Sequence, residues 1–291
     1  AFAKNRPALA LSEDRAGNVL IKYPAHDQSN HAPLTLVGHL DHPGFWIDHV
    51  SGQKVRLIFK GFVAPPHARV GVGARFFERG QAKAVGAGKL VKIVYKKGRL
   101  FSALAKITSG RAVARGFAMW DLPAIALKND FIVSRNCDDS LGSAAALCAL
   151  DQMAQRRPKG VALWGLFTRA EEIGFLGAFE AIRLKTVPKN ACVLSLETSK
   201  ALPTAPQGDG VVIRVGDKAS IFDPGVTDAL CQVARQFNQK NGRFKYQRKL
   251  MDGGSCEATL FCAFGYRASG LAVPLGNYHN QAFDKNGRPT I

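Results

Sequence analysis

Two adjacent acids, Glu171 and Glu172, follow the apolar run 161–167 after the three residues 168–170, and they come shortly before Gly174. Adjacent carboxylates at the end of a buried strand are unfavourable unless a positive charge lies beside them. Neighbouring side chains on an extended segment point in opposite directions, so one glutamate can bind a cation while the other faces a different target. The pair therefore predicts a cation site with a second carboxylate next to it.

A second short apolar run, residues 34–38, ends in His39-Leu40-Asp41. On an extended segment His39 and Asp41 share one face. A carboxylate beside an imidazole can hold the second ring nitrogen and fix the tautomer, as metal-bound histidines usually require. Taken alone, a His-x-Asp pair is more often structural, so this signal depends on support from other parts of the chain.

Six candidate residues occupy the same kind of position, at the C-terminal end of an apolar strand: His39, Asp138, Glu171, Glu172, Glu197 and His279. In open α/β sheets, ligands bind outside those strand ends, so we expect these side chains to meet. Asp138 is notable because the helix that follows needs only one N-cap residue, and Asp139 or Ser140 can supply it.

Two histidines with several carboxylates, and no thiolates, form a donor set that suits zinc, cobalt or manganese. Two ions about 3.5–4 Å apart need one shared carboxylate and roughly two terminal ligands each. The candidates meet this count, with Asp138 as the shared ligand. The terminal pairs are then His39 with Glu172 for one ion and Glu197 with His279 for the other. Glu171 is left as an acid/base.

The elements that position these residues alternate between helix and strand after residue 133. Residues 141–155 and 226–238 have helical patterns, and apolar strands lie between the helices. Residues 45–133 contain instead short β-rich pieces divided by Gly and Pro turns, which predicts a small barrel or sandwich. We expect an α/β catalytic domain, made of residues 1–44 and 134–291, with a mixed sheet flanked by helices and an inserted β domain at 45–133.

The composition is ordinary for a globular chain of 291 residues, with 46% hydrophobic and 21% charged residues. There is no apolar run of 18 residues, so no membrane partner is expected. The six cysteines include no Cys-x-x-Cys pair, which predicts reduced thiols in a cytoplasmic protein. The net charge of +18 is high, but no nucleic-acid motif accompanies it, so nucleic acid is not an expected partner.

Together, these motifs resemble the dinuclear metallo-aminopeptidases. The resemblance rests on His39-x-Asp41, on Cys137-Asp138-Asp139, on the string at 168–178 and on a Pro-x-x-x-x-His sequence ending at His279. The most similar branch is that of the glutamyl, leucyl and lysyl aminopeptidases that form tetrahedral particles. It implies a zinc-exopeptidase-like fold and two divalent ions, zinc or cobalt. The ligands so implied are His39, Asp138, Glu172, Glu197 and His279, with Glu171 as general base and Asp41 steadying His39.

The implied activity is hydrolysis of N-terminal residues from peptides by a water that bridges the two ions and loses a proton to Glu171. The resemblance also implies that the inserted β domain is an assembly surface of a homo-oligomer, with a dodecamer as one expected form. The chain departs from the family at Ser140 and Gly276, where arginines are usual, and at 253–257, where Gly-Gly-Thr-Asp is usual. These departures concern substrate preference and assembly rather than the ligands.

Two other functions fit the same residues. A related dinuclear amidohydrolase, either a deacylase or a carboxypeptidase, would act on small N-acyl or peptide substrates. A binding or scaffold protein that kept the fold but holds little metal is the third reading, and the presence of all five proposed ligands argues against it.

Overall fold

The computed structural model describes residues 2–24 and 32–291, which divide into two compact units. The sheet unit comprises Ala1–Asp41 and Asp138–Gly276, and the barrel unit comprises His42–Cys137 and Asn277–Ile291. The sequence pattern places the C-terminal residues wholly in the catalytic domain, whereas the structure groups residues 277–291 with the barrel unit. Residues 277–291 group with the barrel unit because their side chains and backbone bond to it, as where Gln281 Oε1 accepts the backbone N–H of Ala64 at 2.9 Å.

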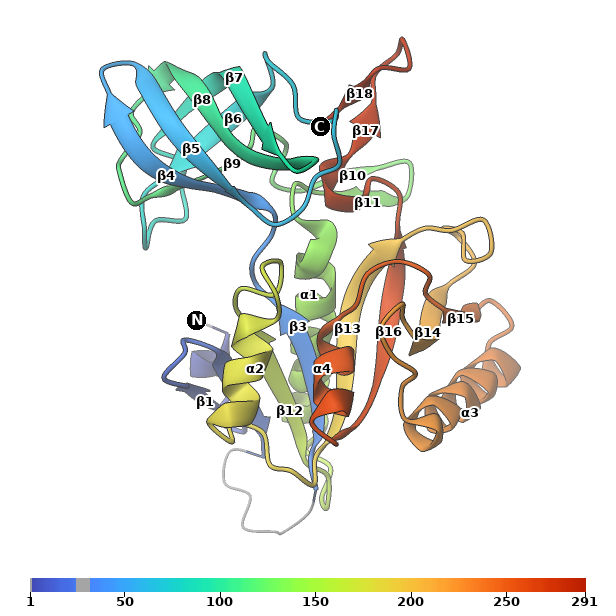
Figure 1. Ribbon diagram of the computed structural model, residues 1–291. Coiled ribbons are helices and arrows are strands. Elements are labelled where there is room, and N and C mark those ends of the chain that lie inside the picture. Colours follow the sequence, from blue (N-terminus) through green and yellow to red (C-terminus); the bar gives the residue numbers. More distant parts are fainter. Residues whose placement is uncertain (1, 25–31) are drawn as a thin grey trace. The chain divides into compact units, whose positions relative to one another are not determined.

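The sheet unit is built on eight strands in the order β1-β2-β12-β3-β13-β16-β14-β15 (Figure 1). Its four central strands run parallel: β12 (Leu163–Thr168), β3 (Leu34–His39), β13 (Cys192–Lys200) and β16 (Arg267–Leu275). Antiparallel neighbours join on both sides, which makes the sheet mixed, as predicted. These outer strands are β1 (Ala10–Glu13), β2 (Val19–Tyr23), β14 (Val211–Gly216) and β15 (Tyr246–Leu250).

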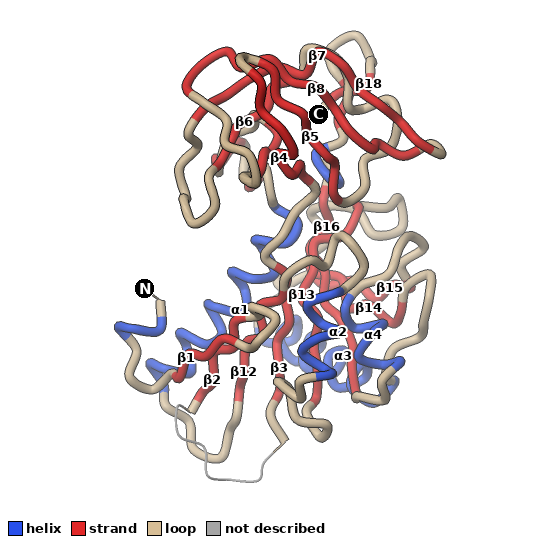
Figure 2. The backbone as a smooth tube through the Cα atoms, turned by 60° about the vertical axis from the view of Figure 1, so that its left-hand side comes forward, coloured by secondary structure: helices blue, strands red, loops and turns tan. Residues whose placement is uncertain are grey.

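Helices cover both faces of this sheet (Figures 1 and 2). On β3, Leu36 packs into a core with Leu150 of one helix, whereas the next residue, Val37, packs with Ala178 of a helix on the opposite face. A strand buried on both faces needs apolar residues in succession, which explains why Leu36 and Val37 follow each other shortly before His39. The helices are α1 (Cys137–Arg156) and α3 (Pro224–Lys240) on one face, with α2 (Leu176–Arg183) and α4 (Glu257–Ala263) on the other.

Six antiparallel strands of the barrel unit close into a barrel in the order β4-β5-β8-β7-β6-β9. Leu57, Phe76, Leu90 and Trp120 fill its interior. The inserted small β-barrel is therefore confirmed. Its strands are β4 (Gly44–Ser51), β5 (Lys54–Lys60), β6 (Gly73–Phe77), β7 (Gly86–Lys96), β8 (Arg99–Gly110) and β9 (Phe117–Trp120). Shorter elements of this unit are β10 (Ala126–Lys128), β11 (Phe131–Val133), β17 (Ala282–Phe283), β18 (Pro289–Thr290) and the 3-10 turn η2 (Tyr278–Asn280).

One boundary matters for the site. The sequence pattern ended a strand at residue 196, with Glu197 just beyond it. The structure instead places Glu197 inside β13, because that strand continues to pair with β16 as far as Lys200 opposite Leu275. A side chain that projects from the middle of a hydrogen-bonded strand is held more firmly than one on a loop.

The helices and the cysteines can be compared with what the composition predicts. None of the helices among the described residues is both long enough and apolar enough to cross a membrane. All six cysteines are free thiols, and three of them, Cys137, Cys231 and Cys256, are buried.

A candidate metal centre

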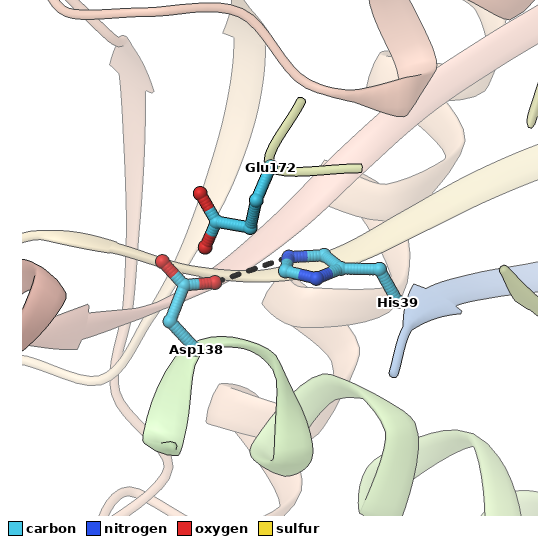
Figure 3. Close-up of side chains that lie close together, drawn as sticks. All are labelled: His39, Asp138 and Glu172. Atoms are coloured by element: carbon cyan, nitrogen blue, oxygen red, sulfur yellow. Dashed lines mark hydrogen bonds and ion pairs between the residues drawn. The ribbon is translucent and has the colours of Figure 1, made fainter. Parts of the chain in front are cut away.

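Three side chains of the sheet unit lie around the end of β3 (Figure 3). His39 is the last residue of β3, Asp138 lies at the start of α1, and Glu172 follows β12 in the loop before α2. Thr168, at the end of β12, pairs in register with His39, so the two strand ends are side by side. His39, Asp138 and Glu172 each offer one donor atom, and these atoms lie within 4.8 Å of one another.

Asp138 also belongs to a second group of donors. Its carboxylate lies with those of Asp139 and Glu197, and one oxygen of each is within 4.8 Å of the others. All three residues are buried. The two groups thus overlap at Asp138, which is the residue that the sequence predicted to be shared.

The hydrogen bonds of His39 decide which of its nitrogens can serve as a ligand. Nδ1 lies 3.0 Å from the backbone carbonyl oxygen of Asp41, and a carbonyl can only accept, so Nδ1 carries a proton. Nε2 faces the carboxylates, at 3.1 Å from Asp138 Oδ1 and at 3.9 Å from one oxygen each of Glu171 and Glu197. A neutral imidazole fixed in this tautomer presents the Nε2 lone pair to a metal.

Asp41 acts at this site through two different groups. Its carboxylate is 3.8 Å from His39 Nδ1, beyond hydrogen-bond range, so the contact expected from the His-x-Asp spacing is made by the backbone carbonyl instead. The carboxylate accepts the backbone N–H groups of Glu171 at 3.0 Å and Glu172 at 3.1 Å. Asp41 therefore fixes the loop that carries the glutamate pair.

Asp139 has a structural role as well as a place among the donors. Its Oδ1 accepts the backbone N–H of Gly142 at 3.0 Å, which is the helix-capping contact that the sequence predicted, and its Oδ2 lies 3.2 Å from the backbone nitrogen of His39. The first residues of α1 are not helical in their backbone angles, and a cis peptide joins Asp138 to Asp139. The side chain of Asp139 thus ties α1 to the end of β3.

Burial of so many acids perturbs their titration. Burial, followed by the charge of Asp138, raises the pKa of Glu172 to about 9. Burial likewise raises the pKa values of Asp139 and Glu171 well above their usual range. Burial alone would lower the pKa of His39, but the hydrogen bond that its protonated ring donates to Asp138 and the charges of Glu171 and Glu197 outweigh it, so this pKa is raised well above its usual value. Without a metal, the site must hold protons in its place.

Two buried charged residues beside this cluster were missed in the sequence. Glu257, the first residue of α4, is fully buried, and its two oxygens have no hydrogen-bond partner of normal geometry among the described residues. Burial raises its pKa to about 8. Arg214 of β14 is also buried, with Nη2 3.6 Å from Asp217, and its charge lowers the pKa of Glu197 against the larger effect of burial. The only signal for Glu257 was the Gly-Gly string that precedes α4.

The donors fit a divalent metal of the zinc type. Imidazole and carboxylate donors without thiolate suit zinc, cobalt and manganese. The cluster gathers several buried acids, and the charges of His39 and Arg214 lower the pKa of Glu197 only partly against burial and the charge of Asp138. A bound cation would resolve this imbalance.

The remaining predicted ligand, His279, belongs to the barrel unit, where it is part of η2 and is buried. Its Nδ1 lies 2.6 Å from the carbonyl oxygen of Phe62, so this imidazole has the same tautomer as His39. Its ring also stacks on that of Tyr278, with centroids 3.8 Å apart. The tautomer is the one that a ligand bound through Nε2 needs, and its place in the ligand set stays a prediction.

Comparison with known proteins gives the family. The model of the M42 glutamyl aminopeptidase family matches residues 113–284, which is more than half of the chain. The chain belongs to this family. This match confirms the resemblance that the motifs indicate. As a member of the M42 family, the protein is a peptide-bond hydrolase, a metal-dependent aminopeptidase. No curated protein matches the chain.

Solved structures show the same fold at low sequence identity. An aminopeptidase from the archaeon Desulfurococcus kamchatkensis matches with a TM-score of 0.76 and 20% identity, over 96% of this chain and 81% of its own. The TET1 peptidase of Pyrococcus horikoshii, which can assemble into a tetrahedron or a large octahedral shell, matches with a TM-score of 0.72 and 17% identity, over 93% and 82% of the two chains. At these identities the likeness shows the fold alone.

Proposed function

We propose that this M42 aminopeptidase removes N-terminal residues from peptides at a centre that holds two divalent ions, zinc or cobalt. The observation that carries the proposal is the overlap of two donor groups at one buried carboxylate, that of Asp138. A single shared carboxylate between two sets of terminal ligands is what a pair of closely spaced ions requires.

In this proposal His39 and Glu172 would hold one ion, Glu197 and His279 would hold the other, and Asp138 would be the ligand that the two share. Asp139 keeps its carboxylate on the backbone of His39 and Gly142 and so orients the site. The bound ions would polarise the scissile carbonyl and lower the pKa of a water. The proton transfers of the reaction are assigned to the protein's own side chains.

Glu171 is the proposed general base. Its carboxylate lies 3.9 Å from His39 Nε2, and its backbone is held by Asp41. Burial raises its pKa well above the usual range, and a carboxylate with a raised pKa accepts a proton more readily. Glu171 takes a proton from the attacking water and passes it to the nitrogen of the leaving amine, which completes the hydrolysis.

We further propose that the enzyme is a cytoplasmic homo-oligomer, with a dodecamer as the first assembly to test. The six free cysteines support a reducing compartment. The assembly is supported by fold neighbours such as the Pyrococcus horikoshii peptidase named above.

The test combines metal analysis with matched substrates. Aminoacyl p-nitroanilides with acidic, aliphatic and basic side chains would be compared with their N-acetyl counterparts, using protein whose metal content has been measured. We expect two ions per chain and release of p-nitroaniline from the unblocked substrates alone. Release of acetate from the N-acetyl compounds, with no p-nitroaniline from the unblocked substrates, would contradict the proposal and would identify a deacylase.

A further inference from the structure

The positive charge of this protein is concentrated in the barrel unit. Segments 42–137 and 277–291 contain 19 Lys and Arg residues against five Asp and Glu, so this unit carries +14 of the chain's net +18. The sheet unit, with more residues, carries the remaining +4. The excess charge is therefore a property of the barrel, which contributes no acid to the donor groups described above.

Three neighbouring strands of the barrel hold the densest part of this charge. β5, β8 and β7 are adjacent, and they contain eight Lys and Arg residues and no Asp or Glu. In their register, Lys106 of β8 is directly opposite Lys54 of β5 on one side and Lys89 of β7 on the other. We call Lys54, Lys106 and Lys89 the lysine row.

The lysine row lies on the outside of the barrel. All three lysines are exposed. A neighbour of each along its strand is buried in the barrel core: Val55 beside Lys54, Leu90 beside Lys89 and Ala105 beside Lys106. One register step along, Leu104 is flanked by Arg56 and Lys92. Five cations thus occupy two successive rungs of three strands, which lie about 4.8 Å apart.

This arrangement opposes folding, because like charges directly opposite each other on adjacent strands are destabilising. Counter-charges are scarce: Arg56 pairs with Asp48 at 3.3 Å, but none of the ion pairs among the described residues includes a lysine of the row. A local arrangement that breaks a stability rule is expected at functional surfaces.

We propose that the lysine row and its flanking cations bind the phosphate backbone of a nucleic acid. The same row of a second copy is a poor occupant of this surface, since two lysine rows facing each other would repel. A surface of a single sign matches a polymer with a charge on every unit better than it matches a protein of mixed charge. Phe101, exposed on β8 with Lys96 Nζ 3.7 Å from its ring centre, adds a face on which a base can stack.

The test uses the full-length protein and a fluorescein-labelled single-stranded 30-mer, with binding followed by anisotropy from 50 to 200 mM NaCl. The variant K54Q/K89Q/K106Q removes the lysine row. The matched control K159Q/K218Q/K240Q removes three exposed lysines of the sheet unit and so changes the net charge equally.

For a single-stranded nucleic acid, each phosphate contact adds about 0.7 to the steepness with which log affinity falls against log salt concentration. The row variant removes three lysines, so its slope should be shallower than that of the wild type by about 2. The salt-induced loss of affinity over this range should then be about 20-fold smaller in the row variant than in the wild type. The control should keep the wild-type slope. Hydrolysis of an aminoacyl substrate should be unchanged in both variants, which shows that they are folded.

Three results would overturn the proposal. The wild type could fail to bind the 30-mer at 50 mM NaCl, or the two variants could lose affinity equally. Alternatively, poly-glutamate or vesicles containing phosphatidylserine could bind through the lysine row while the oligonucleotide does not, which would assign the surface to an acidic protein or to a membrane.

Discussion

The buried acid Glu257 gives a prediction about stability against pH. Its pKa is about 8 in the folded chain, against 4.5 for an ordinary glutamate. Between these values the unfolded chain has lost the proton while the folded chain still holds it. Stability from this group is therefore fully present below pH 4.5 and is lost as the pH rises to about 8.

The expected size follows from the same shift. Each pH unit between the two pKa values costs about 1.4 kcal/mol, so the group should remove on the order of 5 kcal/mol across the whole interval. Glu257→Gln abolishes this titration. The difference in unfolding free energy between variant and wild type should therefore move in favour of the variant by about 1.4 kcal/mol per pH unit.

The assay is urea unfolding of EDTA-treated protein at pH 5, 6, 7 and 8 and constant ionic strength. Glu13→Gln, which removes the charge of an exposed acid on β1, is the matched control and should follow the wild type. If the difference between Glu257→Gln and wild type stayed constant over this range, the account of Glu257 as a buried acid with a raised pKa would be refuted.

Three further predictions concern the metal centre. Metal affinity should rise with pH up to about 9, because the metal must displace the proton of Glu172. Calorimetric titrations with zinc in several buffers would show this proton release. A metal affinity that does not change with pH would count against the site. Asp138→Asn should lose both ions while Glu172→Gln loses one, as measured by elemental analysis after dialysis; equal losses would argue against a shared ligand. Gly142→Ala should lower the amount of metal bound per chain, because its added methyl would clash with Asp139 Oδ1 and the carbonyl of Leu196. If this variant bound as much metal as the wild type, Asp139 would not orient the site.

Much of the site could be predicted because local sequence determines where a strand ends. His39 and Glu172 come at or just after the ends of largely apolar strands, and parallel neighbours such as β3 and β12 bring those ends together. Asp138 stood out because Asp139 alone was enough to cap α1. The mixed sheet and the barrel were likewise readable from the change between helical and short β-rich patterns.

What could not be predicted depends on packing between distant segments. The burial of Glu257 arises from the way α4 packs on the sheet core, through Ala258 and Phe261, and its own neighbours in sequence do not reveal it. Glu197 lies within β13 because of pairing with β16, which comes some 70 residues later in the chain. The grouping of 277–291 with the barrel, and the two separate tasks of Asp41, also depend on hydrogen bonds between segments far apart in sequence.

The central claim, that Glu171 is the proton acceptor beside a metal centre, can be tested by a single comparison. Glu171→Gln would be prepared beside Glu180→Gln, which alters a half-exposed acid on α2 that pairs with Arg183, and both would be assayed for bound metal and for hydrolysis of an unblocked aminoacyl p-nitroanilide. We predict that Glu171→Gln keeps the wild-type metal content and loses about 10²–10⁴-fold in kcat, while the control retains activity. Full hydrolysis by metal-loaded Glu171→Gln would contradict the mechanism.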